Sequence, residues 1–123
     1  GAYADVEAQY VALVQELSAM GLMYLHVLDH SAMGAPPVPA ALKAQLRSLF
    51  AGPFILAGGF DRDSAEAALA AGQADLIAFA RAFLANPDLV KRMQAGAALN
   101  PPDMTTFYTP GPKGYTDYPA LAG

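Results

Sequence analysis

The feature that most limits the fold of this chain is an order of amphipathic helix, glycine and short apolar run, which occurs three times. In the first unit, large apolar residues recur at steps of three and four between Asp5 and Met20, which places them on one face of a helix. Gly21 is expected to end this helix, because glycine accepts the left-handed conformation common after a helix C-terminus. Residues 22–28 then form an almost continuous apolar run, as in a parallel strand covered on both faces.

The other two units repeat this order with short connections. A helical stretch at 38–50 precedes a strand at 54–57. An alanine-rich helix, capped by Asp61 or Asp63 and closed by Gly72, precedes a strand at 76–79. Since parallel neighbours need a crossover helix between them, the sequence predicts an α/β fold with about three parallel strands.

After the third strand the pattern changes. Asn86-Pro87-Asp88 predicts the start of a short helix that runs to about Gln94, with Asn86 or Asp88 as its cap. Residues 97–123 are rich in proline and glycine and are expected to be irregular. We interpret residues 1–123 as one segment of a single domain, with helix–strand units at 1–96 and a tail at 97–123. The tail is expected to pack on the rest because it carries four aromatic residues, Phe107, Tyr108, Tyr115 and Tyr118.

Composition excludes several classes of function. A hydrophobic share of 54% with 15% charged residues is typical of a globular protein. The net charge is −4 and the seven Lys and Arg residues are scattered, so no basic surface for nucleic acid is predicted. There is no cysteine, hence no disulfide or thiolate metal site. No apolar run reaches the roughly 18 residues of a membrane span, and no basic leader opens the sequence, so we expect a cytoplasmic protein.

Candidate binding residues follow the second and third strands, since ligands of α/β proteins bind at the C-terminal ends of strands. Gly58 and Gly59 lack side chains, which lets their backbone N–H groups approach an anion, although two glycines taken alone more often form a tight turn. Ala80 and Arg81 stand at the start of a helical turn, where free N–H groups and a guanidinium would meet the same phosphate. Taken alone, Arg81 is more often a solvated or ion-paired arginine.

The remaining chemical groups give weaker signals. His26 lies within the first strand and is expected to be a hydrogen-bonded core histidine, whereas His30 is expected to be a solvated loop residue. Two histidines without a suitably spaced carboxylate pair do not predict a metal site. Asp117 is interpreted as a cap or a surface charge. No nucleophile–base pair is visible, so no catalytic residue is assigned.

Several ordered motifs resemble one family across nearly the whole chain. They are the strand Tyr24-Leu25-His26-Val27, then Ile55-Leu56-Ala57-Gly58-Gly59-Phe60, then Ile77 to Leu89 with Ala80-Arg81, and finally Thr106-Phe107-Tyr108 with Gly114-Tyr115-Thr116-Asp117-Tyr118-Pro119. With this spacing the chain is similar to the end of the Old Yellow Enzyme-type reductases. It looks most like the bacterial N-ethylmaleimide, xenobiotic and nitrate-ester reductases, which share the Gly-Tyr-x-Asp-Tyr-Pro tail.

The resemblance implies the C-terminal portion of a (β/α)8, or TIM, barrel. It implies a non-covalent FMN that takes hydride from NADPH or NADH and passes it to an electron-poor alkene such as an α,β-unsaturated carbonyl compound. Gly58, Gly59, Ala80 and Arg81 match positions that hold the FMN phosphate. The family usually has glycine where this chain has Ala80, so the match requires a negative φ there. Tyr108 matches an aromatic residue at the substrate pocket; the alternative is a tyrosine that packs the tail.

Such a barrel needs about 250 residues and eight strands. Three strands leave open sheet edges and an apolar inner face, so we expect a complementary N-terminal barrel fragment or another copy of the chain as partner. The resemblance implies that the groups performing the reduction lie in that other part. Two alternatives stay open: another phosphate-binding barrel enzyme with a different ligand, and a non-catalytic half-barrel that uses its exposed edge for assembly.

Overall fold

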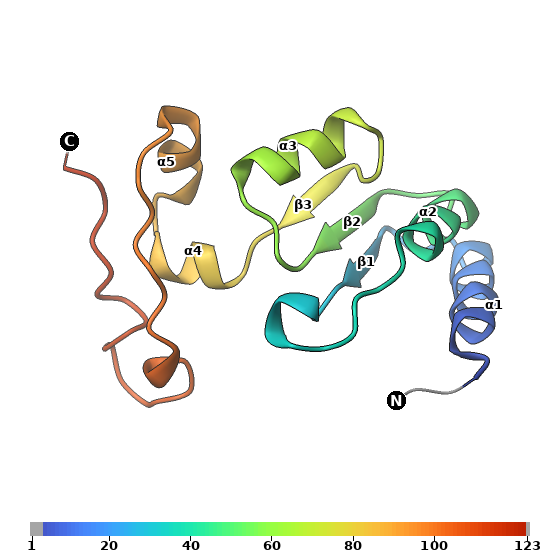
Figure 1. Cartoon of the computed structure of the whole chain (residues 1–123), viewed down its shortest axis with the longest axis horizontal. Helices are drawn as coiled ribbons and strands as arrows, with labels where there is room; N and C mark the ends of the chain where they lie inside the picture. Colours follow the sequence, from blue (N-terminus) through green and yellow to red (C-terminus); the bar gives the residue numbers. More distant parts are fainter. Residues whose placement is uncertain (1–3, 123) are drawn as a thin grey trace. The chain divides into compact units, whose positions relative to one another are not determined.

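The structure is a computed structural model that describes residues 4–122. Its elements in chain order are α1 (Val6–Ala19), β1 (Leu25–Leu28), the 3-10 helix η1 (Ser31–Met33), α2 (Ala40–Leu49), β2 (Phe54–Ala57), α3 (Arg62–Ala70), β3 (Leu76–Ala78), α4 (Arg81–Ala85), α5 (Leu89–Ala95) and the 3-10 helix η2 (Met104–Thr106) (Figure 1).

The chain divides into two compact units, one up to Ala78 and one from Phe79 onward. The first unit holds α1 to β3 and the second holds α4, α5 and the tail. This boundary falls earlier in the chain than the start of the tail at residue 97. The reason is that α4 and α5 are hydrogen-bonded to the tail.

The first unit is built on a three-stranded sheet in the order β1-β2-β3, with both strand pairs parallel. This confirms the predicted parallel sheet with one helix before each strand. The strand β1 begins three residues later than predicted. Its pairing with β2 starts only at Leu25 opposite Phe54, and the apolar residues 22–24 before it are exposed.

One face of the sheet packs against helices and forms the core. Side chains alternate along each strand, so Leu25 and Val27 of β1 share a face with Phe54 and Leu56 of β2. The residues packed with them come from α1, α2, the C-cap of α2 and β3: Val14, Leu42, Leu46, Phe50 and Ile77. The apolar stripe predicted for 38–50 is thus confirmed by the burial of Leu42 and Leu46 in α2, but the stripe predicted for α1 is wrong, because Tyr10 and Leu13 are half-exposed and Val14 faces the core instead.

The opposite face of the sheet is largely uncovered. His26 of β1 is in register with Ile55 and Leu76, and the side chains of Leu28 and Leu76 are 48% and 55% exposed. His26 is itself exposed. Within this chain the expectation of a core histidine therefore does not hold for His26, because alternation places it on the face away from the helices. We call His26, Leu28, Ile55 and Leu76 the open face.

Local capping explains why α3 begins where it does. The Asp61 side chain accepts a hydrogen bond from the Ser64 N–H (2.8 Å), and the Ser64 hydroxyl accepts one from the Asp61 N–H (3.0 Å). This reciprocal capping box satisfies two backbone donors that the helix leaves unpaired. The predicted cap at Asp61 is confirmed. For α5 the cap position is Asp88, and Asn86 is buried instead.

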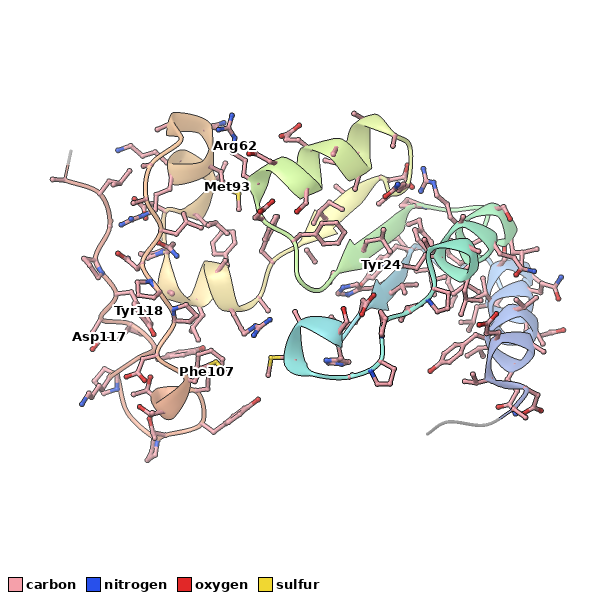
Figure 2. The ribbon with its side chains drawn as sticks, in the orientation of Figure 1. Tyr24, Arg62, Met93, Phe107, Asp117 and Tyr118 are labelled. Carbon is pink, nitrogen blue, oxygen red and sulfur yellow. The ribbon has the colours of Figure 1, made fainter. Side chains whose placement is uncertain are left out.

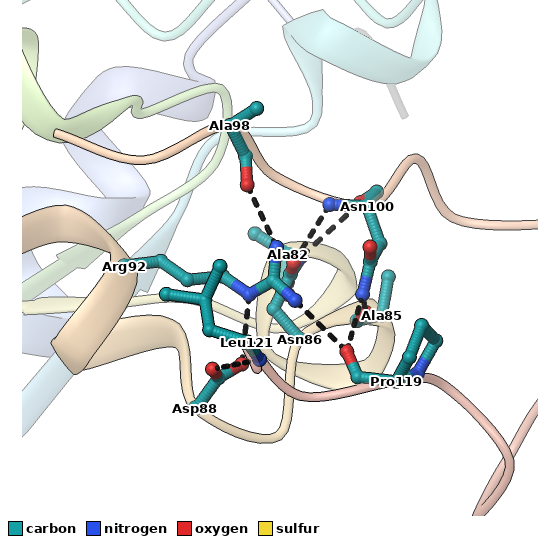
Figure 3. Close-up of polar contacts among 9 residues, drawn as sticks. All are labelled: Ala82, Ala85, Asn86, Asp88, Arg92, Ala98, Asn100, Pro119 and Leu121. Atoms are coloured by element: carbon teal, nitrogen blue, oxygen red, sulfur yellow. Dashed lines mark hydrogen bonds and ion pairs between the residues drawn. The ribbon is translucent and has the colours of Figure 1, made fainter. Parts of the chain in front are cut away.

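The second unit joins α4 and α5 to the tail. Phe107 and Tyr118 of the tail are half-buried (Figure 2), but Tyr108 and Tyr115 are exposed. The expectation that all four aromatic residues pack the tail is thus wrong for two of them. Hydrogen bonds hold the tail instead: Arg92 of α5 and Asn100 both donate to the Pro119 carbonyl, at 2.9 and 2.8 Å (Figure 3).

The core packing predicts a difference between two leucines of the first unit. Leu46→Ala removes a side chain that is 3% exposed and leaves a cavity, so it is expected to lower the free energy of unfolding by about 2–5 kcal/mol. The control is Leu69→Ala, at a helical leucine that is 37% exposed, with an expected loss of under about 1 kcal/mol. Urea unfolding followed by circular dichroism measures both. Equal losses would contradict the described core.

Candidate functional site

Parallel pairing brings the C-terminal ends of the three strands to one edge of the sheet. The last strand residues, Leu28, Ala57 and Ala78, are in register with one another. Asp29 and Gly58 directly follow the first two, and the Asp29 N–H donates to the Ala57 carbonyl at 2.9 Å. This edge is where α/β proteins bind ligands.

Gly58 and Gly59 both have a positive φ, but only Gly58 also lacks room for a side chain. Gly58 has φ +107°, and a Cβ there would lie 1.9 Å from the Asp29 carbonyl oxygen. Gly59 has φ +72°, but a Cβ there would meet only the Ala32 Cβ at 3.4 Å. The tight-turn interpretation therefore holds for Gly58, because the adjacent loop excludes a side chain whether or not a ligand binds.

The same turn leaves two backbone donors available. Among residues 4–122, the N–H groups of Gly58 and Gly59 donate no hydrogen bond to an acceptor of a turn or loop. Gly59 is exposed and Gly58 is partly exposed. Two adjacent N–H groups without side chains can be approached closely by an anion.

Ala80 and Arg81 lie together at the start of α4, in the second unit. Ala80 is the residue before the helix, with φ −102° and ψ −72°, and its carbonyl accepts from the Leu84 N–H at 2.9 Å. The negative φ meets the condition set by the alanine at this position. Arg81, the first residue of α4, is partly buried.

Asp29 is the polar residue of this edge that the sequence analysis did not single out. Its carboxylate accepts from the Ser31 N–H at 2.9 Å and the Val38 N–H at 3.3 Å, and pairs with Lys43 Nζ at 3.0 Å. Burial raises the pKa of Asp29, but the hydrogen bonds from Ser31 and the pairing with Lys43 outweigh it and lower the pKa to about 2. Asp29 thus fixes the loop between β1 and α2, which includes the exposed His30.

A sequence signal for Asp29 exists. An aspartate directly after a strand, with a serine two residues later, is the pattern of a side chain that hydrogen-bonds its own following backbone. The Lys43 partner is 14 residues away and has no such local signal.

Tyr108 lies in the tail at the end of η2 and is 98% exposed. Its ring meets that of Phe107 edge to face, with 6.4 Å between the centroids. A tyrosine this exposed does not pack the tail, so that alternative is not supported. Its role at a substrate pocket stays a prediction.

Residues 4–122 contain neither a cluster of metal-binding side chains nor a helix that could cross a membrane. No group of three or more His, Asp or Glu side chains in this range is placed to hold a metal ion. No helix in the same range combines the length and the apolar character that crossing a bilayer requires.

Comparison with known proteins gives matches over most of the chain. Residues 4–100 match the NADH:flavin oxidoreductase / NADH oxidase family. The chain is 42% identical over 118 residues to 12-oxophytodienoate reductase 2 of Arabidopsis thaliana, which covers 94% of this chain and 32% of that protein. It is 40% identical over 128 residues to putative 12-oxophytodienoate reductase 12 of Oryza sativa subsp. japonica, covering 95% of this chain and 31% of that protein.

Solved structures agree. Morphinone reductase superposes with a TM-score of 0.86 at 44% identity, over 94% of this chain and 31% of that one. A variant of NCR from Zymomonas mobilis gives a TM-score of 0.85 at 34% identity, over 98% and 40%. The chain therefore spans about a third of the length of its relatives. The predicted fold class is confirmed: the parallel sheet with its helices is part of a (β/α)8 barrel.

The turn geometry predicts that two glycines tolerate alanine differently. Gly58→Ala must adopt a positive φ and also displace the Asp29 carbonyl, whereas Gly72→Ala, at φ +69°, has no heavy atom within 4 Å of the new Cβ. Gly72→Ala is expected to cost about 1–2 kcal/mol and Gly58→Ala distinctly more. Thermal or urea unfolding measures both, and equal costs would show that the loop after β1 does not constrain Gly58.

The lowered pKa of Asp29 predicts a pH-dependent stability. A carboxyl group whose folded pKa of about 2 lies below its ordinary value of 3.8 contributes stability above pH 4, and this is lost as pH falls through about 2. Asp29→Asn is therefore expected to lower the urea midpoint at pH 7, with a difference from the original chain that shrinks from pH 4 to pH 2. The exposed Glu66→Gln serves as control. A constant difference across this pH range would contradict the assignment.

Proposed function

Because this chain belongs to the NADH:flavin oxidoreductase / NADH oxidase family, that of the Old Yellow Enzymes, we propose that it is the FMN-phosphate-holding part of an ene-reductase. The family assignment rests on a match over residues 4–100. The activity of the whole enzyme, its substrates and its partner are part of the proposal, since the chain spans only about a third of its relatives.

In the proposed enzyme, FMN supplies hydride transfer from NADPH or NADH to an electron-poor alkene such as an α,β-unsaturated carbonyl compound. A nicotinamide donor is supported by a relative: morphinone reductase, 41% identical to this chain, is known in complex with tetrahydroNAD. The choice between NADPH and NADH stays open in the proposal. We retain the cytoplasmic location as part of it, since the chain contains no cysteine and the proposed enzyme uses reduced nicotinamide.

The residues at the expected phosphate positions fit such a group chemically. Gly58 and Gly59 offer two N–H groups that donate no hydrogen bond to an acceptor of a turn or loop in the described chain. Ala80 has a negative φ, so its methyl group does not disturb the backbone that starts α4. Arg81 adds a positive charge, and charge-assisted hydrogen bonds to phosphate are about twice as strong as neutral ones. The N–H groups of Gly58 and Gly59 are the observation that carries the proposal.

Tyr108 is proposed to border the alkene above the flavin. Its nearly complete exposure is consistent with a residue that contacts something other than its own unit. Within the described chain, the carboxylate of Asp29 at the end of β1 is occupied by hydrogen bonds to its own loop and to Lys43. The group that donates the proton is therefore assigned to the part of the enzyme outside this sequence.

The open face supports a partner that completes the barrel. An isolated sheet face with half-exposed leucines at positions 28 and 76 is unusual for a monomer in water. In a (β/α)8 barrel the inner face of each strand is filled by side chains of the other strands. We propose a complementary N-terminal barrel fragment as this partner, and another copy of the chain as the alternative. Neither nucleic acid nor membrane has a place in the proposal.

The match to the flavin oxidoreductase family argues against the alternative of another phosphate-binding barrel enzyme with a different ligand. A non-catalytic half-barrel is kept as an outcome of the test below, because the open face would serve assembly equally well.

The test distinguishes binding of the FMN phosphate from binding of the flavin ring. The chain is purified with the polypeptide equivalent to the preceding part of morphinone reductase, and FMN and riboflavin are titrated by quenching of flavin fluorescence. Losing a hydrogen-bonded charge costs about 1.5–3 kcal/mol, so Arg81→Ala is expected to weaken FMN binding roughly tenfold or more. Riboflavin lacks the phosphate, and its affinity is expected to change less than about twofold.

The matched control is Arg62→Ala, at an exposed arginine that starts α3 just as Arg81 starts α4. It is expected to leave both affinities unchanged. A stable, colourless assembly in the original protein would favour the non-catalytic half-barrel. An equal loss of FMN and riboflavin binding in Arg81→Ala would refute the phosphate role.

A further inference from the structure

The tail motif that runs from Gly114 to Pro119 has no part in the function proposed above, although it carries much of the family resemblance. In the structure it closes a loop. Residues 103–118 leave the body of the second unit and return to it, with η2 at the start and Tyr108 exposed beyond it. We call this segment the tail loop.

The first closure of the tail loop joins its two ends. The Asp103 N–H donates to the Tyr118 hydroxyl oxygen at 2.8 Å. Asp103 also caps η2, since its carboxylate accepts from the Thr105 N–H at 3.0 Å and from the Thr105 hydroxyl at 2.7 Å. These bonds from Thr105 lower the pKa of Asp103. The start of η2 is thereby fixed to the end of the loop.

The second closure is a close contact across the loop. Gly114 is buried against Thr106 of η2, and a Cβ at Gly114 would lie 1.9 Å from the Thr106 hydroxyl oxygen and 2.3 Å from its Cβ. The Asp117 carboxylate accepts from the Gly114 N–H at 2.7 Å and holds the turn that makes this approach. Figure 2 shows Asp117 and Tyr118 in this part of the chain, near Phe107.

The loop is anchored to the helices at its far end. The Pro119 carbonyl accepts from Arg92 and Asn100, and the Leu121 N–H donates to Asp88 at 2.8 Å (Figure 3). Asn100 also donates to the Ala85 carbonyl of α4 at 2.9 Å. Arg92 is 5% exposed, with its charge balanced by Asp88 and by the Ala98 and Pro119 carbonyls. A satisfied buried network of this kind is rigid.

We infer that Gly114, Asp117 and Tyr118 form a clasp whose role is to position Tyr108, and that the tail loop therefore controls how the alkene is bound. This inference rests on the proposed function, in which Tyr108 borders the substrate. The clasp holds η2 in place, and Tyr108 follows η2 by two residues, with the Thr109 N–H bonded to the Thr106 carbonyl at 3.3 Å. The clasp residues touch neither substrate nor flavin; they are positioning residues.

The helix α4 links this loop to the phosphate side. Asn86, which is fully buried, donates to the Ala82 carbonyl of α4 and to the Asn100 carbonyl, and accepts from the Asn100 N–H. The frame that carries the tail loop is thus the helix that begins with Arg81. One unit holds both the proposed phosphate residue and the proposed substrate residue.

The tail loop offers a matched pair of glycines for the test. Gly114→Ala must displace Thr106, whereas Gly111→Ala, at φ +99° in the same loop, has no heavy atom within 4 Å of the new Cβ. Both variants carry the strain of a positive φ, so only the contact with Thr106 distinguishes them. Tyr118→Phe is a second variant that removes only the hydroxyl bonded to Asp103.

The first measurement is amide hydrogen exchange of residues 103–109 in this chain as it stands. Gly114→Ala and Tyr118→Phe are expected to raise the exchange rate of this segment about tenfold or more over Gly111→Ala and the original chain. Unchanged exchange in Gly114→Ala would overturn the clasp. This arm does not depend on flavin, so its result stands even if no FMN is bound and the proposed function fails.

The second measurement is a double-mutant cycle in the flavin-loaded complex. Gly114→Ala is expected to raise the KM for an α,β-unsaturated ketone about fivefold or more, with the rate of flavin reduction by the nicotinamide donor unchanged. In a Tyr108→Ala background the same substitution is expected to have no further effect, because coupled residues are not additive. Independent, additive effects, or an equal loss in both half-reactions, would refute the positioning role.

Discussion

Parallel pairing of the three strands is the constraint on which the rest of the first unit depends. It requires a helix between successive strands, and it places the ends of all three strands in register at one edge. The crowding of Asp29 against Gly58 follows from this register, because each directly follows a strand at paired positions. The same pairing leaves one face of the sheet covered by helices and the other open.

Much of this was predictable from local patterns. Periods of three to four residues located the helices, and a capping residue such as Asp61 acts only on its nearest neighbours, so its role could be recognised in the sequence. Gly58 and Gly59 were recognisable as a turn after a strand. The family resemblance added the functional interpretation of Ala80 and Arg81, which spacing alone did not supply.

What escaped prediction depends on contacts between distant residues. Asparagine is a common helix cap, but Asn86 is buried. Its side-chain amide donates to the Asn100 carbonyl and accepts from the Asn100 N–H, 14 residues later. Arg92 could be matched with Asp88 by helical spacing, whereas its bond to Pro119 spans 27 residues. His26 required knowledge of which strand face the helices cover. Such long-range pairings cannot be recognised from neighbouring residues in the sequence, because each side chain could pair with many other groups.

The backbone at Ala80 has a consequence for how the chain tolerates its departure from the family. With φ −102° and ψ −72° the residue lies in the right-handed helical region, where alanine fits without strain. Glycine at such a position samples many more conformations before folding, and replacing it by alanine typically stabilises a protein by about 0.4–1 kcal/mol. Alanine at position 80 therefore reduces the conformational entropy of the unfolded chain. The residue that departs from the family motif is thus expected to stabilise the folded protein slightly, beside the proposed anion site.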